Sequence, residues 1–144
     1  MIIQEKTYHL ILESFPNVPP EAGCILGSYN GIICEFVFDA GIPRNDVAIY
    51  TPNIGLVNQI IADWNKQGIC FCGLAHSHPQ TQKSLSLNDK NYINTIMASM
   101  PNSVSKLYFP LVFPGYEIIS FVAIKGRKGI EINPDNIIIH QTKE

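Results

Sequence analysis

Two histidines one residue apart, followed by a serine and an aspartate, form the strongest chemical signal in this chain. Residues 76–79 read His-Ser-His-Pro, and residues 86–89 read Ser-Leu-Asn-Asp. Side chains two residues apart on a strand share a face, so both imidazoles can reach one ion. Two imidazoles and one carboxylate suit zinc, with iron or another divalent ion as the alternative. The spacing therefore predicts a single zinc ion held by His76, His78 and Asp89.

Each half of this pattern also has a purely structural explanation. Histidines at the end of a strand can hydrogen-bond to backbone groups or water without a metal. A Ser-x-x-Asp sequence can be a helix cap, in which Ser86 accepts from backbone N–H groups and Asp89 is favoured by the helix dipole. However, Asp89 falls on the helix side that carries Ile93 and Ile96, which should face inward. An inward carboxylate needs a partner, and a metal ion on the two histidines would be one.

A zinc ion with three protein ligands keeps a fourth position for water, whose pKa falls to about 7. Such a water is a nucleophile at neutral pH, so the expected chemistry is hydrolysis. Hydrolysis also requires a general base and a group that stabilises the oxyanion. The hydroxyl of Ser86 could share the oxyanion charge, and this role is compatible with its role as a helix cap.

The elements that must position these residues follow from the pattern of apolar side chains. The stretch before the histidines is apolar throughout, which is typical of a central strand covered on both faces. The pattern predicts helices over 4–14, 53–67 and 87–100, and strands over 22–28, 32–38, 47–51, 69–75, 106–113, 117–125 and 130–140. Because helices interleave with strands and two hairpins add antiparallel pairs, we expect a mixed sheet flanked by helices, an α/β or α+β domain.

Length, charge and cysteine content limit the classes of protein to which the chain can belong. With 144 residues, 46% of them apolar, we expect one domain over residues 1–144. The formal net charge of −2 argues against nucleic-acid binding, which needs a cationic surface. No signal peptide or membrane-spanning run is visible. The four cysteines lie in apolar runs, as expected for buried reduced thiols in a cytoplasmic protein.

Taken together, these motifs resemble the signature of the JAMM metalloproteases, also called the JAB/MPN type. The resemblance adds an upstream glutamate, Glu21, in the segment 20–27 that reads Pro-Glu-Ala-Gly-Cys-Ile-Leu-Gly. It covers residues 5–125 approximately and includes the order helix, hairpin, helix, histidine strand and helix. It implies a JAB/MPN-like fold, whose architecture is similar to that of cytidine deaminases.

The resemblance also implies a role for each motif residue. His76, His78 and Asp89 would bind zinc. Glu21 would take a proton from the zinc-bound water and pass it to the leaving amine, while Ser86 would support the tetrahedral intermediate. The reaction would be hydrolysis of an amide or isopeptide bond at the C-terminal tail of a ubiquitin-like or sulfur-carrier protein. Activating and conjugating enzymes would be further partners, as for the compact prokaryotic members that this short chain resembles.

Two other functions stay open at this point. The first is a non-catalytic scaffold of the same fold that only binds partner proteins. Family members of that kind usually lose metal ligands, whereas this chain keeps all of them. The second is a zinc-dependent nucleobase deaminase, which would need His-x-Glu and a later Pro-Cys-x-x-Cys, and neither pattern occurs. The sequence therefore favours a zinc-dependent peptidase or isopeptidase.

Overall fold

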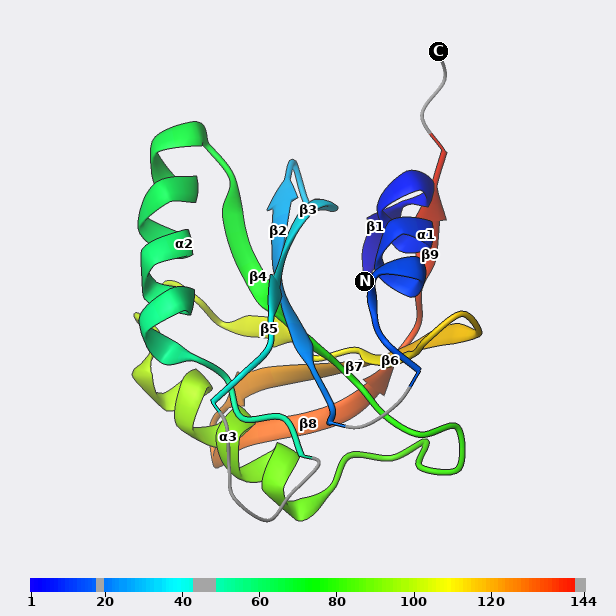
Figure 1. Cartoon of the computed structure of the whole chain (residues 1–144). Coiled ribbons are helices and arrows are strands. Elements are labelled where there is room, and N and C mark those ends of the chain that lie inside the picture. Colours follow the sequence, from blue (N-terminus) through cyan, green and yellow to red (C-terminus); the bar gives the residue numbers. More distant parts are fainter. Residues whose placement is uncertain (18–19, 43–48, 142–144) are drawn as a thin grey trace.

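A mixed sheet runs through the protein and places the histidine strand near its middle (Figure 1). The computed structural model describes residues 1–17, 20–42 and 49–141. Within these ranges the helices are α1 (Glu5–Ser14), α2 (Ile54–Gln67) and α3 (Leu87–Ser99). The strands in the same ranges are β1 (Ile2–Gln4), β2 (Gly23–Tyr29), β3 (Ile32–Asp39), β4 (Cys70–Ser77), β5 (Lys106–Tyr108), β6 (Leu111–Phe113), β7 (Glu117–Gly126), β8 (Gly129–Asp135) and β9 (Ile138–His140). The expected mixed α/β class is thus confirmed.

The order of the strands fixes the surroundings of β4. The sheet runs β5-β7-β6-β4-β2-β3-β1-β9, and β8 pairs with β7. β2 lies antiparallel to both β3 and β4, whereas β4 and β6 run parallel. The carboxyl end of β4 therefore lies between the start of β2 and the strand β6, with hydrogen-bonded neighbours on both sides.

Two apolar clusters cover the two faces of this central region. α2 and α3 pack on one face, where Trp64, Ile93 and Met97 contact the inward side of the sheet. α1 packs on the other face through Ile11. Neighbouring residues of β4 alternate between the clusters: Leu74 belongs to the first and Ala75 to the second. Figure 1 shows the same arrangement, with α2 and α1 on opposite sides of β2 and β4. The expectation of a central strand covered on both faces is confirmed for the part of β4 that leads into the histidines, whereas the first residues of the strand are exposed or half-buried.

The helices around the histidine strand begin and end where local signals place them. Asn53 caps α2 by accepting from the N–H of Leu56 at 3.2 Å, and Gly68 ends the helix in a left-handed conformation at φ 75°. At the start of α3, the side chain of Ser86 accepts from the backbone of Asp89, and the Asp89 side chain accepts from the backbone of Ser86. The expected helix cap at this position is therefore present.

Several predicted strands differ in the structure. The strand expected over 106–113 is two strands, because Pro110 offers no N–H and its carbonyl accepts from His76 N at 3.1 Å. The strand expected over 130–140 is also two, because β8 pairs with β7 and β9 pairs with β1. For the strand expected over 47–51, residues 49–51 form no strand and residues 47–48 lie outside the described ranges. β1 was not expected.

The cysteines are only partly as predicted. All four are free thiols, and Cys24 is buried. Cys34 and Cys72 are half-buried, however, and Cys70 is exposed. Cys70 is the first residue of β4, and the residues of this strand are buried only from Gly73 onward. In the described part of the chain, no helix has the length and apolar content that crossing a membrane would need.

Gly73 is the glycine whose replacement should be most damaging to the sheet. It lies in β4 at φ 150°, and an added Cβ would stand 1.8 Å from the carbonyl oxygen of Tyr108. We expect Gly73→Ala to lower the free energy of unfolding by about 2–4 kcal/mol through strain and overpacking, measured by urea titration. Gly55→Ala is the matched control, because its Cβ would meet nothing closer than 3.5 Å and helix propensity favours alanine. Equal stability of the two variants would contradict the close packing of β4 against β5.

Candidate metal centre

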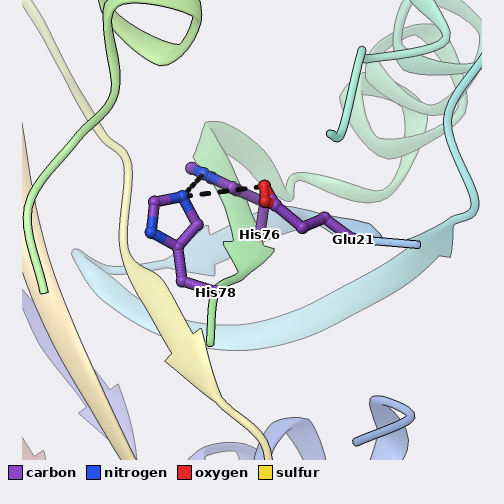
Figure 2. Close-up of side chains that lie close together, drawn as sticks. All are labelled: Glu21, His76 and His78. Carbon is purple, nitrogen blue, oxygen red and sulfur yellow. Dashed lines mark hydrogen bonds and ion pairs between the residues drawn. The ribbon is translucent and has the colours of Figure 1, made fainter. Parts of the chain in front are cut away.

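The structure brings together the three residues that the sequence predicts as zinc ligands. His76 and His78 lie at and just beyond the end of β4, and Asp89 lies in the first turn of α3. All three residues are almost completely buried, with exposed fractions of 0%, 4% and 2%. In Figure 2 both imidazole rings point to the same place, and the side chain of Glu21 reaches toward them from the start of β2.

The ligand atoms are as close as a shared ion would require. The Nε2 atoms of His76 and His78 are 2.9 Å apart. The two carboxylate oxygens of Asp89 lie 3.1 Å from these nitrogens, Oδ1 from His76 and Oδ2 from His78. Ligands bound to tetrahedral zinc at about 2.0–2.2 Å stand about 3.3–3.5 Å from one another. Outward shifts of these nitrogen and oxygen atoms by a few tenths of an ångström would therefore make room for the ion.

The chemistry of these donor atoms fits a cation. The Nδ1 atom of His78 lies 2.9 Å from the carbonyl oxygen of Gln82, which can only accept, so Nδ1 carries the proton and donates it. In the neutral ring, Nε2 of His78 then presents a lone pair to the carboxylate of Asp89. Lone pairs facing one another at this distance repel unless a proton or a metal ion lies between them. The donor set of His76, His78 and Asp89 therefore fits zinc.

Burial and hydrogen bonding set the charge of each ligand. Burial lowers the pKa of His76, which favours the neutral imidazole that binds metals. Burial acts in the same direction on His78, but its hydrogen bonds to Asp89 and to the Gln82 carbonyl raise its pKa overall. Burial alone would raise the pKa of Asp89, yet hydrogen bonds from both histidines hold it well below its usual value. Asp89 is therefore an ionised carboxylate, and a bound cation would favour neutral His78.

Glu21 brings a second carboxyl group to the two histidines. It lies farther from the imidazoles than Asp89 does, and it is less readily ionised. Its Oε1 atom lies 3.8 Å from Nε2 of His78, and it can present an oxygen within 4.8 Å of both imidazoles. Burial raises the pKa of Glu21 to about 7, with His78 opposing this shift and Asp89 adding to it. Asp89 is nearer than Glu21 to both imidazoles and is fully ionised, so its carboxylate is the better placed of the two to join them around a cation. A carboxyl group with a pKa near 7 suits proton transfer.

Ser86 combines its structural role with a free hydrogen-bond donor. Its Oγ accepts from the N–H of Asp89 at 3.1 Å, and its own N–H donates to Oδ2 of Asp89 at 2.9 Å. The serine therefore holds the Asp89 carboxylate in place. Since the cap uses the hydroxyl only as an acceptor, the hydroxyl proton can still be donated to a substrate oxygen.

Two tyrosines at the site were not predicted from the sequence. The hydroxyl of Tyr92 lies 2.9 Å from Nδ1 of His76, and the ring of Tyr50 stacks on the same imidazole. Tyr92 follows Asp89 by three residues, so the two share a helix face. This spacing in the sequence could have predicted that Tyr92 lies at the site. Tyr50 lies between β3 and α2 in the sequence, and no spacing connects it with the histidines.

A small surface pocket is lined by Glu21 and His78. Its volume is about 160 Å³, and four of its lining residues are prolines: Pro16, Pro20, Pro79 and Pro114. This volume is below the roughly 300–1,000 Å³ of pockets that enclose drug-sized ligands. The pocket can therefore admit a small group beside the carboxylate of Glu21, whereas His76 and Asp89 are buried and do not line it.

Comparison with known proteins yields similar folds. No family model and no curated protein matches the chain. The solution structure of protein DSY2949 from Desulfitobacterium hafniense is similar, with a TM-score of 0.64 and 19% identity, covering 100% of this chain and 96% of that one. A protein from Salinibacter ruber is similar with a TM-score of 0.55 and 15% identity, covering 97% of this chain and 92% of that one. At these identities the likeness extends to the fold alone.

Proposed function

We propose that the protein is a zinc-dependent peptidase or isopeptidase of the JAMM type. It would hydrolyse an amide or isopeptide bond at the C-terminal tail of a ubiquitin-like or sulfur-carrier protein. One observation carries the proposal: the imidazoles of His76 and His78 and the carboxylate of Asp89 meet within 3.1 Å, with a second carboxylate beside them. A scaffold that only bound partners would have no need of four buried or half-buried titratable side chains at one point.

The residues around the ligands supply the remaining parts of a hydrolytic site. Zinc bound there would lower the pKa of a water and polarise the substrate carbonyl. Glu21, with its pKa near 7, takes a proton from the attacking water and delivers it to the leaving amine. The Ser86 hydroxyl donates a hydrogen bond to the carbonyl oxygen as negative charge develops. His78 and Asp89 stay in place through Gln82 and the cap of α3.

The proposed substrate is consistent with the small pocket beside the site. A pocket of about 160 Å³ between prolines suits an extended tail that ends in small residues such as glycine. Prolines have no N–H and restricted dihedrals, so these walls are rigid and offer few hydrogen bonds. Strand addition would supply the backbone contacts of such a tail. We further propose the cytoplasm as the compartment, since free thiols persist in reducing conditions.

A cleavage assay tests the proposed function. The zinc-loaded protein is incubated with a panel of ubiquitin-like and sulfur-carrier proteins that carry C-terminal extensions, and products are identified by mass spectrometry. We expect cleavage directly after the tail of at least one panel member. Chelator should abolish it and added zinc should restore it. A protein that binds zinc and a panel member but cleaves none would support the scaffold alternative instead.

A further inference from the structure

The imidazole of His76 is enclosed by two tyrosines that contact it in different ways. The ring centroids of Tyr50 and His76 are 5.8 Å apart and the planes differ by 16°, so Tyr50 stacks on the imidazole. Tyr92 meets the same ring edge-on, at 5.8 Å and 76°, with its hydroxyl 2.9 Å from Nδ1. His76 has no exposed surface, so water does not compete for these contacts.

Tyr92 and Asp89 lie on the same helix and contact the two different ring nitrogens of His76. Asp89 places Oδ1 3.1 Å from Nε2, and Tyr92, three residues later in α3, places its hydroxyl against Nδ1. Residues three apart lie on one face of a helix, so one turn of α3 fixes both sides of the ring. His78 has a comparable arrangement, in which Gln82 supplies the acceptor for Nδ1.

Tyr50 cannot supply the same hydrogen bond. Its hydroxyl donates to Oδ2 of Asp39 at 2.6 Å, and Asp39 also accepts from the N–H of Asn53 at 3.0 Å. The glycine at position 23 leaves room for this ring, because an added Cβ would stand 2.3 Å from Cζ of Tyr50. Tyr50 therefore restricts the plane of the His76 ring, but it does not determine which ring nitrogen carries the proton.

We propose that Tyr92 is a positioning residue of the metal centre: when an ion takes the place of the proton between Nε2 of His76 and Asp89, the Tyr92 hydroxyl oxygen accepts the Nδ1–H of His76 and thereby directs the Nε2 lone pair at the ion. The proposal rests on the metal site of the proposed function. A neutral imidazole carries one proton, so fixing it on Nδ1 leaves Nε2 free to bind metal. An acceptor on the outer nitrogen also makes the inner nitrogen more basic, and losing such a partner typically weakens metal binding about 10- to 100-fold.

Tyr92→Phe tests this proposal, because it removes only the hydroxyl. The matched control is Tyr50→Phe, which keeps the ring against His76 and removes a hydroxyl bound to Asp39. Zinc affinity is measured by competition with a chromogenic chelator. We expect Tyr92→Phe to bind zinc about 10- to 100-fold more weakly than the wild type. Tyr50→Phe should unfold at a lower temperature but retain its zinc affinity.

A second measurement follows the Nδ1 proton itself, which a change in folding stability alone would not move. Nitrogen-15 NMR of the zinc-loaded protein should show a slowly exchanging proton on Nδ1 of His76, and this signal should shift or vanish in Tyr92→Phe. Zinc affinity and Nδ1 signal unchanged in Tyr92→Phe would overturn the proposal, and so would equal weakening in Tyr50→Phe. Weakened zinc binding in Tyr92→Phe, together with no cleavage of any panel protein, would leave this proposal standing and reject the peptidase function.

Discussion

Glu21→Gln should retain the zinc ion and lose about 10²- to 10⁴-fold in kcat, the usual contribution of a general acid–base group. Glutamine keeps the size and polarity of the side chain but cannot take a proton from water. The ligands His76, His78 and Asp89 are untouched, so metal content should equal that of the wild type. The measurement is kcat on whichever panel substrate the wild type cleaves, together with zinc per chain by elemental analysis.

The control for this variant is Glu13→Gln, which changes an exposed glutamate on α1 and should leave both quantities unchanged. Two outcomes would contradict the assignment. Undiminished kcat in Glu21→Gln would show that another group moves the proton. Loss of zinc in the same variant would make Glu21 a ligand, a role that its position within 4.8 Å of both imidazoles also permits geometrically.

Asp89→Asn should abolish the stabilisation that zinc gives the wild type. An ion that binds only the folded protein stabilises it by about 4 kcal/mol at a thousand times its dissociation constant. Asparagine keeps an oxygen that can accept from the N–H of Ser86, so the cap of α3 survives, but the negative charge on the ion is lost. We expect thermal unfolding of the wild type to shift upward with zinc and downward with chelator. The Asp89→Asn variant should unfold at the same temperature with zinc and with chelator.

Ser86→Ala separates the helix cap from the metal in this experiment. Removing the cap acceptor should lower the stability of the protein by about 1 kcal/mol with or without zinc. The zinc-dependent shift should therefore persist in Ser86→Ala. A shift of normal size in Asp89→Asn would mean that the carboxylate serves the cap alone, which is the structural explanation that its Ser-x-x-Asp pattern allows.

Most of the fold around the site could be predicted because its signals are local. The spacing of apolar residues in α2 predicted burial of Trp64, and the alternation of β4 predicted two imidazoles on one face. The inward face of α3 predicted the burial of Asp89 beside Ile93. Each of these inferences depends on residues within a few positions of one another, and each agrees with the structure.

The elements that escaped prediction depend on contacts between distant parts of the chain. β1 and β9 have three residues each and form by parallel pairing, with Ile2 opposite Ile138. No sequence pattern within β1 or β9 predicts that the two strands pair with each other. The same is true of Tyr50, which reaches His76 only because Gly23 lacks a side chain. Glu21 is an intermediate case, since its position before β2 became informative only through the resemblance to JAMM proteases.

Metal analysis of the purified wild-type protein tests the central claim most directly. Zinc-loaded protein, freed of excess metal, is examined by elemental analysis and zinc X-ray absorption, alongside the double variant His76→Ala, His78→Ala. We predict about one zinc ion per chain, with two imidazole nitrogens at about 2.0–2.1 Å, and none in the double variant. A wild type that binds no zinc, or a double variant that binds it equally well, would show that these histidines hold no metal.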